Sequence, residues 1–285
     1  MSNPLPDRNE YRDLVARALA EDLGSGDLTT RAIVPANVRA SAIVLAKTHC
    51  VVAGLSVAEE VCRQVDASLQ WRAQCADGDR RAPGDVIATI EGPAAGVLGA
   101  ERTLLNVLQH LSGVATLTRR FVDATGGHVA ILDTRKTLPT LRCLEKYAVR
   151  CGGGRNHRFG LFDGVLIKDN HIRVAGSIGE AVSRMRSALA AEAQTLPVEV
   201  ETQSLVEVRE AIEAGADIIM LDNLTTAEMQ EAITLIAGRA KVELSGGVTL
   251  DRIPALAALG ADFVSVGALT HSAPAADISL EIETH

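Results

Sequence analysis

Six short apolar runs follow one another along the second half of the chain, and each ends in polar or glycine residues. Most of the segments between them are rich in alanine and leucine, with apolar residues at helical spacing. Strands that alternate with helices predict right-handed strand–helix–strand units and a parallel sheet. Burial on both faces of such a sheet explains the almost continuous Ile, Leu and Val content of the runs. The expected strands are 128–134, 164–169, 197–201, 217–222, 241–245 and 262–267, and the helices between them are 176–194, 203–214, 225–237 and 251–259.

This pattern favours an α/β barrel over an open, doubly wound sheet. The dinucleotide-binding form of the open sheet carries a G-x-G-x-x-G turn after its first strand, and no such turn follows residues 128–134. In α/β barrels the functional groups gather at the carboxyl ends of the strands. The chemistry of this chain is therefore expected at those ends.

The first third of the chain mixes short strands and helices, which is typical of a small α+β domain. One helix is marked by apolar residues on a single face and ends at Gly24. The expected elements are helices 10–24 and 56–65, and strands within 41–55, 69–75 and 86–91. A long helix over 101–118 leads towards the barrel. We expect an α+β domain at 1–105, joined by the tail 273–285, and a barrel at 106–272.

Composition narrows the class of protein. Apolar residues make up 47% of the 285 residues and charged residues 22%, as in ordinary globular proteins, which excludes a disordered or fibrous chain. The net charge of −8 gives no basic footprint for nucleic acid. The five cysteines include no C-x-x-C pair, so reduced thiols fit better than disulfides or a zinc ribbon. Neither a signal peptide nor a membrane span is visible, so we expect a cytoplasmic protein without membrane contact.

The apolar runs end consistently in groups that can do chemistry. A charged group at the end of an apolar strand is costly unless it is paired or used. Five consecutive strands that end in this way favour function over coincidence. The residues at these ends are Asp133, Arg135, Lys136, Lys168, Asp169, Asn170, Glu199, Glu201, Asp222, Asn223, Ser245, Gly246, Gly247 and Gly267.

Positive charge is concentrated in one segment. Between Ile131 and His171 there are eight Lys or Arg residues against four acids, although the whole chain is acidic. A local cationic patch in an acidic protein favours a small anionic ligand over a polymer. The i,i+4 spacing of Arg142, Lys146 and Arg150 predicts only a solvated helix face. The better ligand candidates are Arg135, Lys136, His157, Arg158 and Lys168, at strand ends or in the glycine-rich loop 151–160.

Two further features suit a phosphorylated ligand. Ser245-Gly246-Gly247 exposes backbone N–H groups after one strand, and Gly267 follows the next, which resembles the phosphate cradle of the last barrel strands. Glu201 and Asp222 on successive strands can hold Mg²⁺, which takes one or two carboxylates plus substrate phosphates. The alternative is that these carboxylates pair with Lys136 and Lys168 across the barrel mouth.

These motifs identify a family. The chain resembles the quinolinate phosphoribosyltransferases, also called carboxylating nicotinate-nucleotide pyrophosphorylases, over nearly its whole length. The long stretch from DTRKT to GGGRNHR is highly specific. The matching segments are EDLGSGDLTT (21–30), AERTLLNVLQHLSGVAT (100–116), DTRKTLPTLRCLEKYAVRCGGGRNHRFGL (133–161), LIKDNH (166–171), EVE (199–201), LDN (221–223), SGG (245–247) and VGALTHS (266–272).

The resemblance implies an activity and an assembly. Quinolinate and phosphoribosyl pyrophosphate would give nicotinate mononucleotide, CO₂ and pyrophosphate in NAD biosynthesis, with Mg²⁺ and no organic cofactor. The fold would be an N-terminal hammerhead-like α+β domain with an incomplete α/β barrel. The enzyme would be a homodimer in which the N-terminal region of one subunit covers the barrel mouth of the other.

The resemblance also assigns roles to residues. The quinolinate ligands would be Arg102, donated across the dimer, with Arg135, His157, Arg158 and Lys168. The ligands of phosphoribosyl pyrophosphate would be Lys136, Ser245, Gly246, Gly247, Gly267 and His271. Glu201 and Asp222 would hold the metal, and Lys136, Glu201 and Asp222 would be catalytic.

Three alternatives stand beside this assignment. A nicotinate-type phosphoribosyltransferase would act without decarboxylation, but a single carboxylate needs fewer cations than Arg102, Arg135 and Arg158 offer. A phosphosugar-handling barrel would need a Schiff-base lysine, for which Lys168 is the candidate. A binding module without catalysis fits poorly with so many ionisable groups at strand ends.

Overall fold

The computed structural model describes residues 6–284. Residues 1–5 and His285 lie outside the described residues. The expectation that the chain has no signal peptide falls partly on residues 1–5. The described chain forms two compact units, each assembled from separate stretches. The first unit contains residues up to Arg119, Thr137–Gly153 and those from Ala268 on, and the second contains Arg120–Lys136 and Gly154–Gly267. The domain limits expected from the sequence stay a prediction.

The elements follow one another in a mixed order and then in a regular strand–helix alternation. In the first third they are α1 (Arg8–Leu23), α2 (Leu28–Ile33), β1 (Arg39–Ala46), β2 (Cys50–Val51), α3 (Leu55–Val65), β3 (Gln70–Ala73), β4 (Arg80–Arg81), β5 (Val86–Pro93) and α4 (Ala94–Ala124). They continue as β6 (Ala130–Leu132), α5 (Arg142–Cys151), β7 (Val165–Ile167), α6 (Asp169–Ala175), α7 (Ile178–Ala191), β8 (Val198–Thr202), α8 (Leu205–Glu213), β9 (Ile218–Asp222), α9 (Thr226–Ile236), β10 (Lys241–Ser245), a 3₁₀ turn (Leu250–Arg252), α10 (Ile253–Ala257), β11 (Phe263–Ser265), α11 (Ala268–His271) and β12 (Ile278–Thr284).

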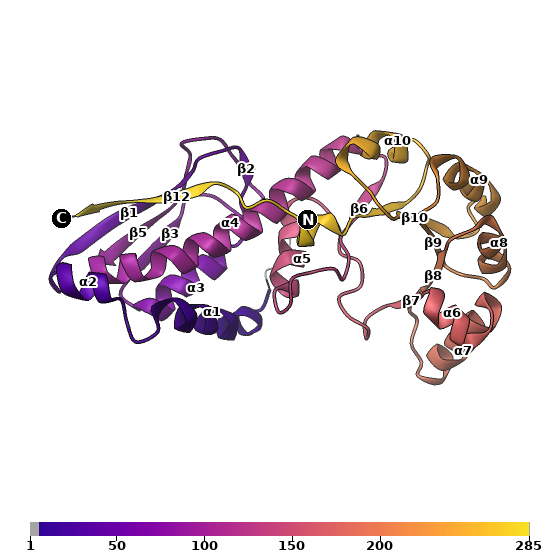
Figure 1. The fold of residues 1–285 in the computed structure, drawn as a ribbon, viewed down its shortest axis with the longest axis horizontal. Helices are drawn as coiled ribbons and strands as arrows, with labels where there is room; N and C mark the ends of the chain where they lie inside the picture. The colour runs from indigo at the N-terminus through magenta and orange to yellow at the C-terminus, as the bar shows by residue number, and fades with distance from the viewer. Residues whose placement is uncertain (1–5, 285) are drawn as a thin grey trace. The chain divides into compact units, whose positions relative to one another are not determined.

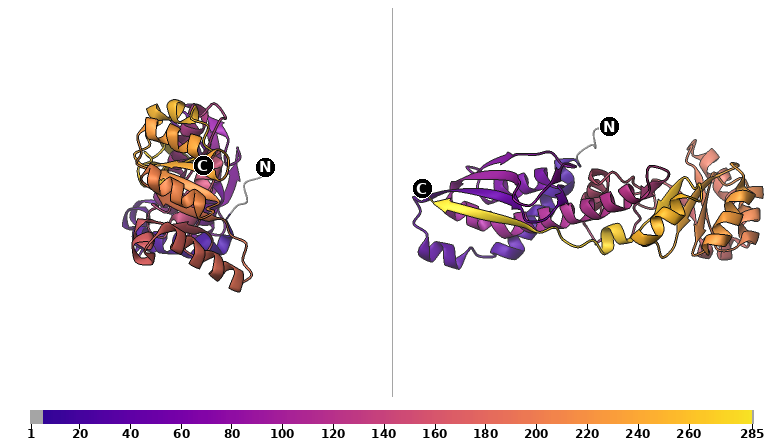
Figure 2. Two further views of the ribbon diagram at one scale, coloured as in Figure 1. Left: turned by 90° about the vertical axis from the view of Figure 1, so that its right-hand side faces the viewer. Right: turned by 90° about the horizontal axis from the view of Figure 1, so that it is seen from above.

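The first unit is built on an antiparallel sheet with the strand order β12-β1-β5-β3. Alternate residues of β1 are buried on one face, namely Ala40, Ala42, Val44 and Ala46, as the two-residue period of a half-buried strand requires. Helices α3 and α4 lie against this sheet (Figure 1). The C-terminal strand β12 runs antiparallel to β1 over its whole length, which Figure 2 shows from above.

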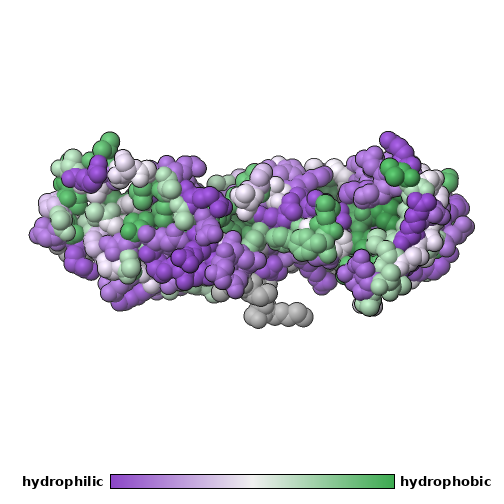
Figure 3. Space-filling model, turned by 90° about the horizontal axis from the view of Figure 1, so that it is seen from below, coloured by the Kyte–Doolittle hydropathy of each residue, from purple (hydrophilic) through white to green (hydrophobic). Residues whose placement is uncertain are grey.

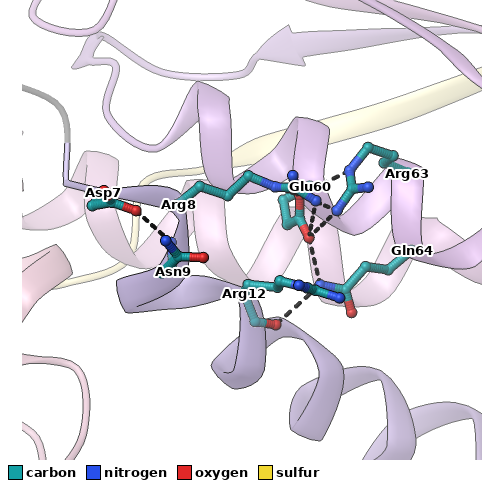
Figure 4. A network of polar contacts seen from close by, with 7 residues as sticks. All are labelled: Asp7, Arg8, Asn9, Arg12, Glu60, Arg63 and Gln64. Carbon is teal, nitrogen blue, oxygen red and sulfur yellow. Dashed lines mark hydrogen bonds and ion pairs between the residues drawn. The ribbon is translucent and has the colours of Figure 1, made fainter.

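A buried carboxylate fastens α1 to α3 within the first unit. Glu60 is only 3% exposed, and it accepts hydrogen bonds from Arg8 Nε at 2.7 Å and from the Arg63 guanidinium (Figure 4). Gln64 joins the network by donating to the backbone oxygen of Arg12 in α1 at 3.0 Å. Because Arg8 and Arg63 remain half-exposed, the network places one buried charge between two partly solvated ones.

The second unit contains a six-stranded, wholly parallel sheet. Its order is β6-β11-β10-β9-β8-β7, with helices α7, α8 and α9 on the outer side of the strands (Figure 1). This is the strand order of a barrel whose last strand pairs with its first, but β6 and β7 form the two edges and do not pair with each other. The expected incomplete parallel barrel is confirmed, and its opening lies between its first two strands.

Two helices of the described chain differ from the expectations. Helix α4 is longer than predicted, from Ala94 to Ala124. The solvated face expected on α5 is wrong, because Lys146 is 2% exposed and lies within a buried run of this helix. The periodicity of the three basic residues could not reveal this burial, since it depends on what packs against the helix.

All five cysteines are free thiols, and no described helix is long and apolar enough to cross a membrane.

Apolar side chains are exposed beside the open edge of the second unit. Leu161 and Phe162, in the loop before β7, are 71% and 79% exposed. They line a groove of about 700 Å³ together with residues of β7 and α7. Figure 3 shows green apolar surface between polar segments on this unit. Large exposed apolar patches mark contact sites for other molecules.

Candidate active site

The inward-facing residues of β8 are acidic. Strand β8 is buried throughout, and its two-residue period turns Glu199 and Glu201 to the same side. Glu201, 9% exposed, accepts a hydrogen bond from Lys168 Nζ at 2.8 Å at the carboxyl end of the neighbouring strand β7. The structure thus contains one of the lysine–carboxylate pairs that the sequence left as an alternative to metal binding.

A segment of loop occupies the opening of the barrel. Arg155 forms an isolated parallel bridge with Leu132, with hydrogen bonds from Arg155 N to Ile131 O (2.8 Å) and from Asp133 N to Arg155 O (3.1 Å). The loop therefore continues the sheet beyond β6. The sequence placed this loop near the ligand by its basic residues, but it did not predict that its backbone would pair with a strand.

Asp133 fixes the next two residues of that loop. The Asp133 side chain is fully buried, and it accepts hydrogen bonds from the His157 backbone N–H at 2.9 Å and from the Asn156 amide. A buried ionised carboxylate requires such donors. Asp133 thus acts in this structure as the anchor of the loop, whereas its place at a strand end had suggested a chemical role.

Arg158 follows these anchored residues directly along the loop. Burial, and then the nearby Arg135 guanidinium, lower the pKa of Arg158 from its ordinary value. Arg158 Nη1 donates to the backbone oxygen of Gly164 at 3.2 Å, whereas its Nε is buried without a hydrogen-bond partner among the described residues. A partly buried guanidinium with an unused donor suits an anionic ligand, because an anion would favour its charged form.

His157 points into the barrel. Its Nε2 lies 2.9 Å from Glu199 Oε2 and 3.7 Å from Glu243 Oε2, and all three side chains are largely buried. The sequence assigned His157 to substrate by resemblance, and it gave no role to Glu243. The available signal was the acidic residue in the middle of the otherwise apolar run of β10, two residues before Ser245.

The turn after β10 forms a backbone cradle. Gly246 and Gly247 have positive φ angles of 93° and 56°, which favour glycine. The space for a Cβ at Gly246 is already taken, since it would lie 2.2 Å from Asn223 Oδ1 and 2.6 Å from Asn223 N. Asn223 N also donates to Ser245 O at 3.1 Å, so the ends of β9 and β10 are tied together.

Glu201 and Asp222 are the metal ligands expected from the sequence. Asp222, at the end of β9, is partly exposed, and its Oδ2 accepts a hydrogen bond from the Asn223 amide at 2.8 Å. In the described part of the chain, the one group of three side chains close enough to enclose an ion is His157 with Glu199 and Glu243. Glu201 and Asp222 stand outside that group. They offer hard carboxylate oxygens on adjacent strands, which suit Mg²⁺ if phosphates complete its coordination.

Four predicted site residues are exposed, namely Arg102, Lys136, Gly247 and His271. His271 ends α11, where its Nδ1 contacts Ser272 Oγ at 2.6 Å. Arg102 and His271 belong to the first unit, whereas Lys136 and Gly247 belong to the second. The roles of the predicted site residues stay predictions.

Comparisons with known proteins decide the family. The model of the quinolinate phosphoribosyl transferase N-terminal domain matches residues 27–112, and that of the C-terminal domain matches residues 114–281. The chain belongs to the quinolinate phosphoribosyltransferase family.

Relatives of this family are similar over almost the full chain. A probable nicotinate-nucleotide pyrophosphorylase [carboxylating] of Bacillus subtilis is 43% identical over 96% of this chain and 93% of its own. A quinolinate phosphoribosyltransferase [decarboxylating] of Nicotiana glauca is 41% identical over 96% of this chain and 83% of its own. The solved nicotinate-nucleotide pyrophosphorylase from Francisella tularensis superposes with a TM-score of 0.93 at 39% identity, covering 99% and 98% of the two chains. Membership in this family argues against both the binding module and the phosphosugar barrel.

Proposed function

We propose that this chain transfers the phosphoribosyl group of phosphoribosyl pyrophosphate to quinolinate and removes one carboxyl group as CO₂. The products are nicotinate mononucleotide, CO₂ and pyrophosphate. Relatives at 41–43% identity carry the names of this activity. The observation that carries the proposal is Arg158, whose buried Nε has no hydrogen-bond partner among the described residues, on the loop that Asp133 and the bridge to Leu132 hold at the barrel opening.

Quinolinate fits the cationic side of the site. It is a pyridine with two adjacent carboxylates, and guanidinium forks bind carboxylates with two parallel hydrogen bonds. Arg135 and Arg158 supply such forks, and Lys168 supplies a third cation beside them. When a substrate carboxylate binds the Lys168 ammonium group, Glu201 loses its present partner and becomes available to the second substrate.

The phosphoribosyl donor fits the opposite side. Its 5′-phosphate would lie on the backbone N–H groups of Ser245, Gly246 and Gly247, in a turn whose positive φ angles favour glycine. Glu201 and Asp222 would hold Mg²⁺ on the pyrophosphate, where the ion would neutralise the charge of the leaving group. Lys136 would add a further cation to this end.

The reaction follows from these positions. As the bond between the anomeric carbon and pyrophosphate breaks, positive charge develops on the ribose, and the nearby Glu201 carboxylate stabilises it. The pyridine nitrogen forms the new bond and becomes positively charged. When the adjacent carboxylate leaves as CO₂, its bonding electron pair stays on the ring carbon, next to that nitrogen, until a proton replaces it. The substrate is therefore its own electron sink, and no organic cofactor is needed.

Substrate choice tests the proposal. Release of pyrophosphate and of CO₂ would be measured with quinolinate and, separately, with nicotinate, which has a single carboxylate. We expect turnover of quinolinate with equal amounts of CO₂ and pyrophosphate, and at least 100-fold lower kcat/KM for nicotinate. Equal kcat/KM for the two acids would instead indicate a phosphoribosyltransferase without decarboxylation.

Assembly and location complete the proposal. We propose a homodimer in which Arg102 of each subunit serves the barrel of the other, and a cytoplasmic enzyme. The resemblance supports the dimer, and the exposed apolar groove beside β7 is consistent with a buried interface.

A further inference from the structure

A buried group of three ionisable side chains includes His157, one of the proposed quinolinate ligands. His157 comes from the loop in the barrel opening, Glu199 from β8 and Glu243 from β10. Their side chains are 12%, 6% and 1% exposed. One polar atom of each lies within 4.8 Å of the others, and the shortest distance is the 2.9 Å from His157 Nε2 to Glu199 Oε2.

The charges in this group are unequal. Two ionised carboxylates side by side in a dry interior repel each other, so one of them keeps a proton. Burial, and then the neighbouring Glu199, raise the pKa of Glu243 well above its usual range. Glu199 is the carboxylate that lies closer to the imidazole, at 2.9 Å from His157 Nε2 against 3.7 Å for Glu243.

The same histidine is held at its backbone. Its N–H donates to the buried Asp133 at 2.9 Å, and the bridge between Arg155 and Leu132 fixes the chain two residues earlier. His157 thus has its backbone tied to the end of β6 and its side chain tied to β8 and β10. The next residue in the chain is Arg158, whose Nη1 donates to the backbone oxygen of Gly164.

We propose that Glu199 and Glu243 are positioning residues that hold the His157 imidazole, and with it Arg158, in the geometry that binds the pyridine dicarboxylate. Glu199 is the carboxylate that contacts the imidazole directly, at 2.9 Å from Nε2. Glu243 is the second and more distant carboxylate, at 3.7 Å. This inference rests on the proposed function, because it concerns the binding of quinolinate.

The unequal distances predict unequal effects of the same substitution. Glutamine has the shape of glutamate but carries no charge. Glu199→Gln replaces the carboxylate in direct contact with His157 and should raise the KM for quinolinate at least tenfold. Glu243→Gln replaces the more distant carboxylate and should keep this KM within about threefold of the native value. Glu243→Met removes the contact at 3.7 Å altogether and should raise this KM less than Glu199→Gln does.

The experiment compares these three variants and the native enzyme. The KM for quinolinate, the KM for phosphoribosyl pyrophosphate, kcat and Tm would be measured for each, together with the imidazole signals of His157 in histidine-labelled protein, assigned with His157→Asn. We expect Glu199→Gln to change the quinolinate KM and the His157 signals while the KM for phosphoribosyl pyrophosphate stays within twofold. Glu60→Gln, in the buried acid of the first unit, is the matched control and should lower Tm without changing either KM.

Each other outcome overturns the inference. An unchanged quinolinate KM in Glu199→Gln, or equal effects of glutamine at both positions, would show that the contact of the Glu199 carboxylate does not position the histidine. A metal ion bound in equal amount to the native protein, and lost in both glutamine variants, would make the group a metal site. If Glu199→Gln does not fold, Glu199→Asp keeps the charge but moves it away from the imidazole, and a native quinolinate KM in that variant would equally refute the inference. Failure of the proposed function is seen separately, as absent quinolinate turnover in the native enzyme.

Discussion

The ion pair between Lys168 and Glu201 joins the two halves of the proposed site in a single contact of 2.8 Å. The Lys168 side chain is 43% exposed, and the Glu201 side chain is 10% exposed. The lysine can therefore turn to an incoming carboxylate, whereas the glutamate is fixed by the strand. This difference makes the pair a contact that a substrate could replace, and under the proposed function Glu201 would then serve the phosphoribosyl donor.

Removal of either proposed donor-side carboxylate should reduce the rate of reaction. We expect Glu201→Ala and Asp222→Ala each to lower kcat by about 10²–10³-fold, the usual cost of losing one group that stabilises transition-state charge. Quinolinate binding, measured by equilibrium titration, should remain within about threefold of native, because the arginine forks are untouched.

Glu180→Ala is the control for this experiment. Glu180 is a half-exposed acid that pairs with Arg184 on α7, so its loss should leave kcat unchanged. A loss of quinolinate affinity at unchanged kcat in Glu201→Ala or Asp222→Ala would move that residue to the quinolinate subsite.

Among the elements, the turn after β10 gives the most specific prediction. Gly246→Ala adds a methyl group where Asn223 already lies, so either the turn or the end of β9 must move. We expect the KM for phosphoribosyl pyrophosphate to rise at least tenfold and the KM for quinolinate to stay within twofold, in steady-state assays with each substrate varied.

Gly238→Ala is matched to this variant. Gly238 also has a positive φ, of 76°, but a Cβ there would meet no atom within 4 Å. It should share the backbone strain, which costs about 1 kcal/mol of folding stability, without the change in donor binding. If both variants weaken donor binding equally, the clash with Asn223 is not the cause.

The contact between α1 and α3 makes a prediction about stability alone. Glu60→Ala removes the acceptor of hydrogen bonds from Arg8 and Arg63 (Figure 4). Hydrogen bonds to charged groups contribute about 1.5–3 kcal/mol, so we expect the free energy of unfolding in urea to fall by this amount. Glu59→Ala, which changes the exposed neighbour, should lower it by less than about 0.5 kcal/mol. Equal losses in the two variants would mean that the network adds nothing.

Elements with a clear period could be predicted from the sequence, and contacts between distant segments could not. The apolar runs predicted all six strands of the barrel, because a strand that is buried on both faces has almost continuous apolar residues. The bridge of Arg155 to Leu132 and the orientation of Glu243 depend on partners more than 20 residues away, so no local pattern reveals them. The burial of Lys146 has the same origin. The resemblance supplied the roles of the site residues, which periodicity alone left open.

On the scale of the whole molecule, the distribution of the proposed ligands raises the question of assembly. Every proposed ligand on the barrel strands belongs to the second unit, whereas Arg102 lies on α4 in the first. A residue outside the barrel can serve a barrel mouth in its own chain or in a partner. The resemblance favours a partner, which predicts that two differently damaged subunits can repair each other.

Mixed dimers distinguish these cases. Arg102→Ala and Lys136→Ala should each be almost inactive as homodimers, because every site then lacks one proposed ligand. In a two-fold dimer with shared sites, a heterodimer of the two variants has one site with both lesions and one site with neither. Activity should therefore return to about half of the native value per heterodimer. With both ligands in one chain, each site of the heterodimer would keep one lesion, and mixing would restore nothing even after verified subunit exchange. Purified heterodimers carrying two different affinity tags make this measurement direct.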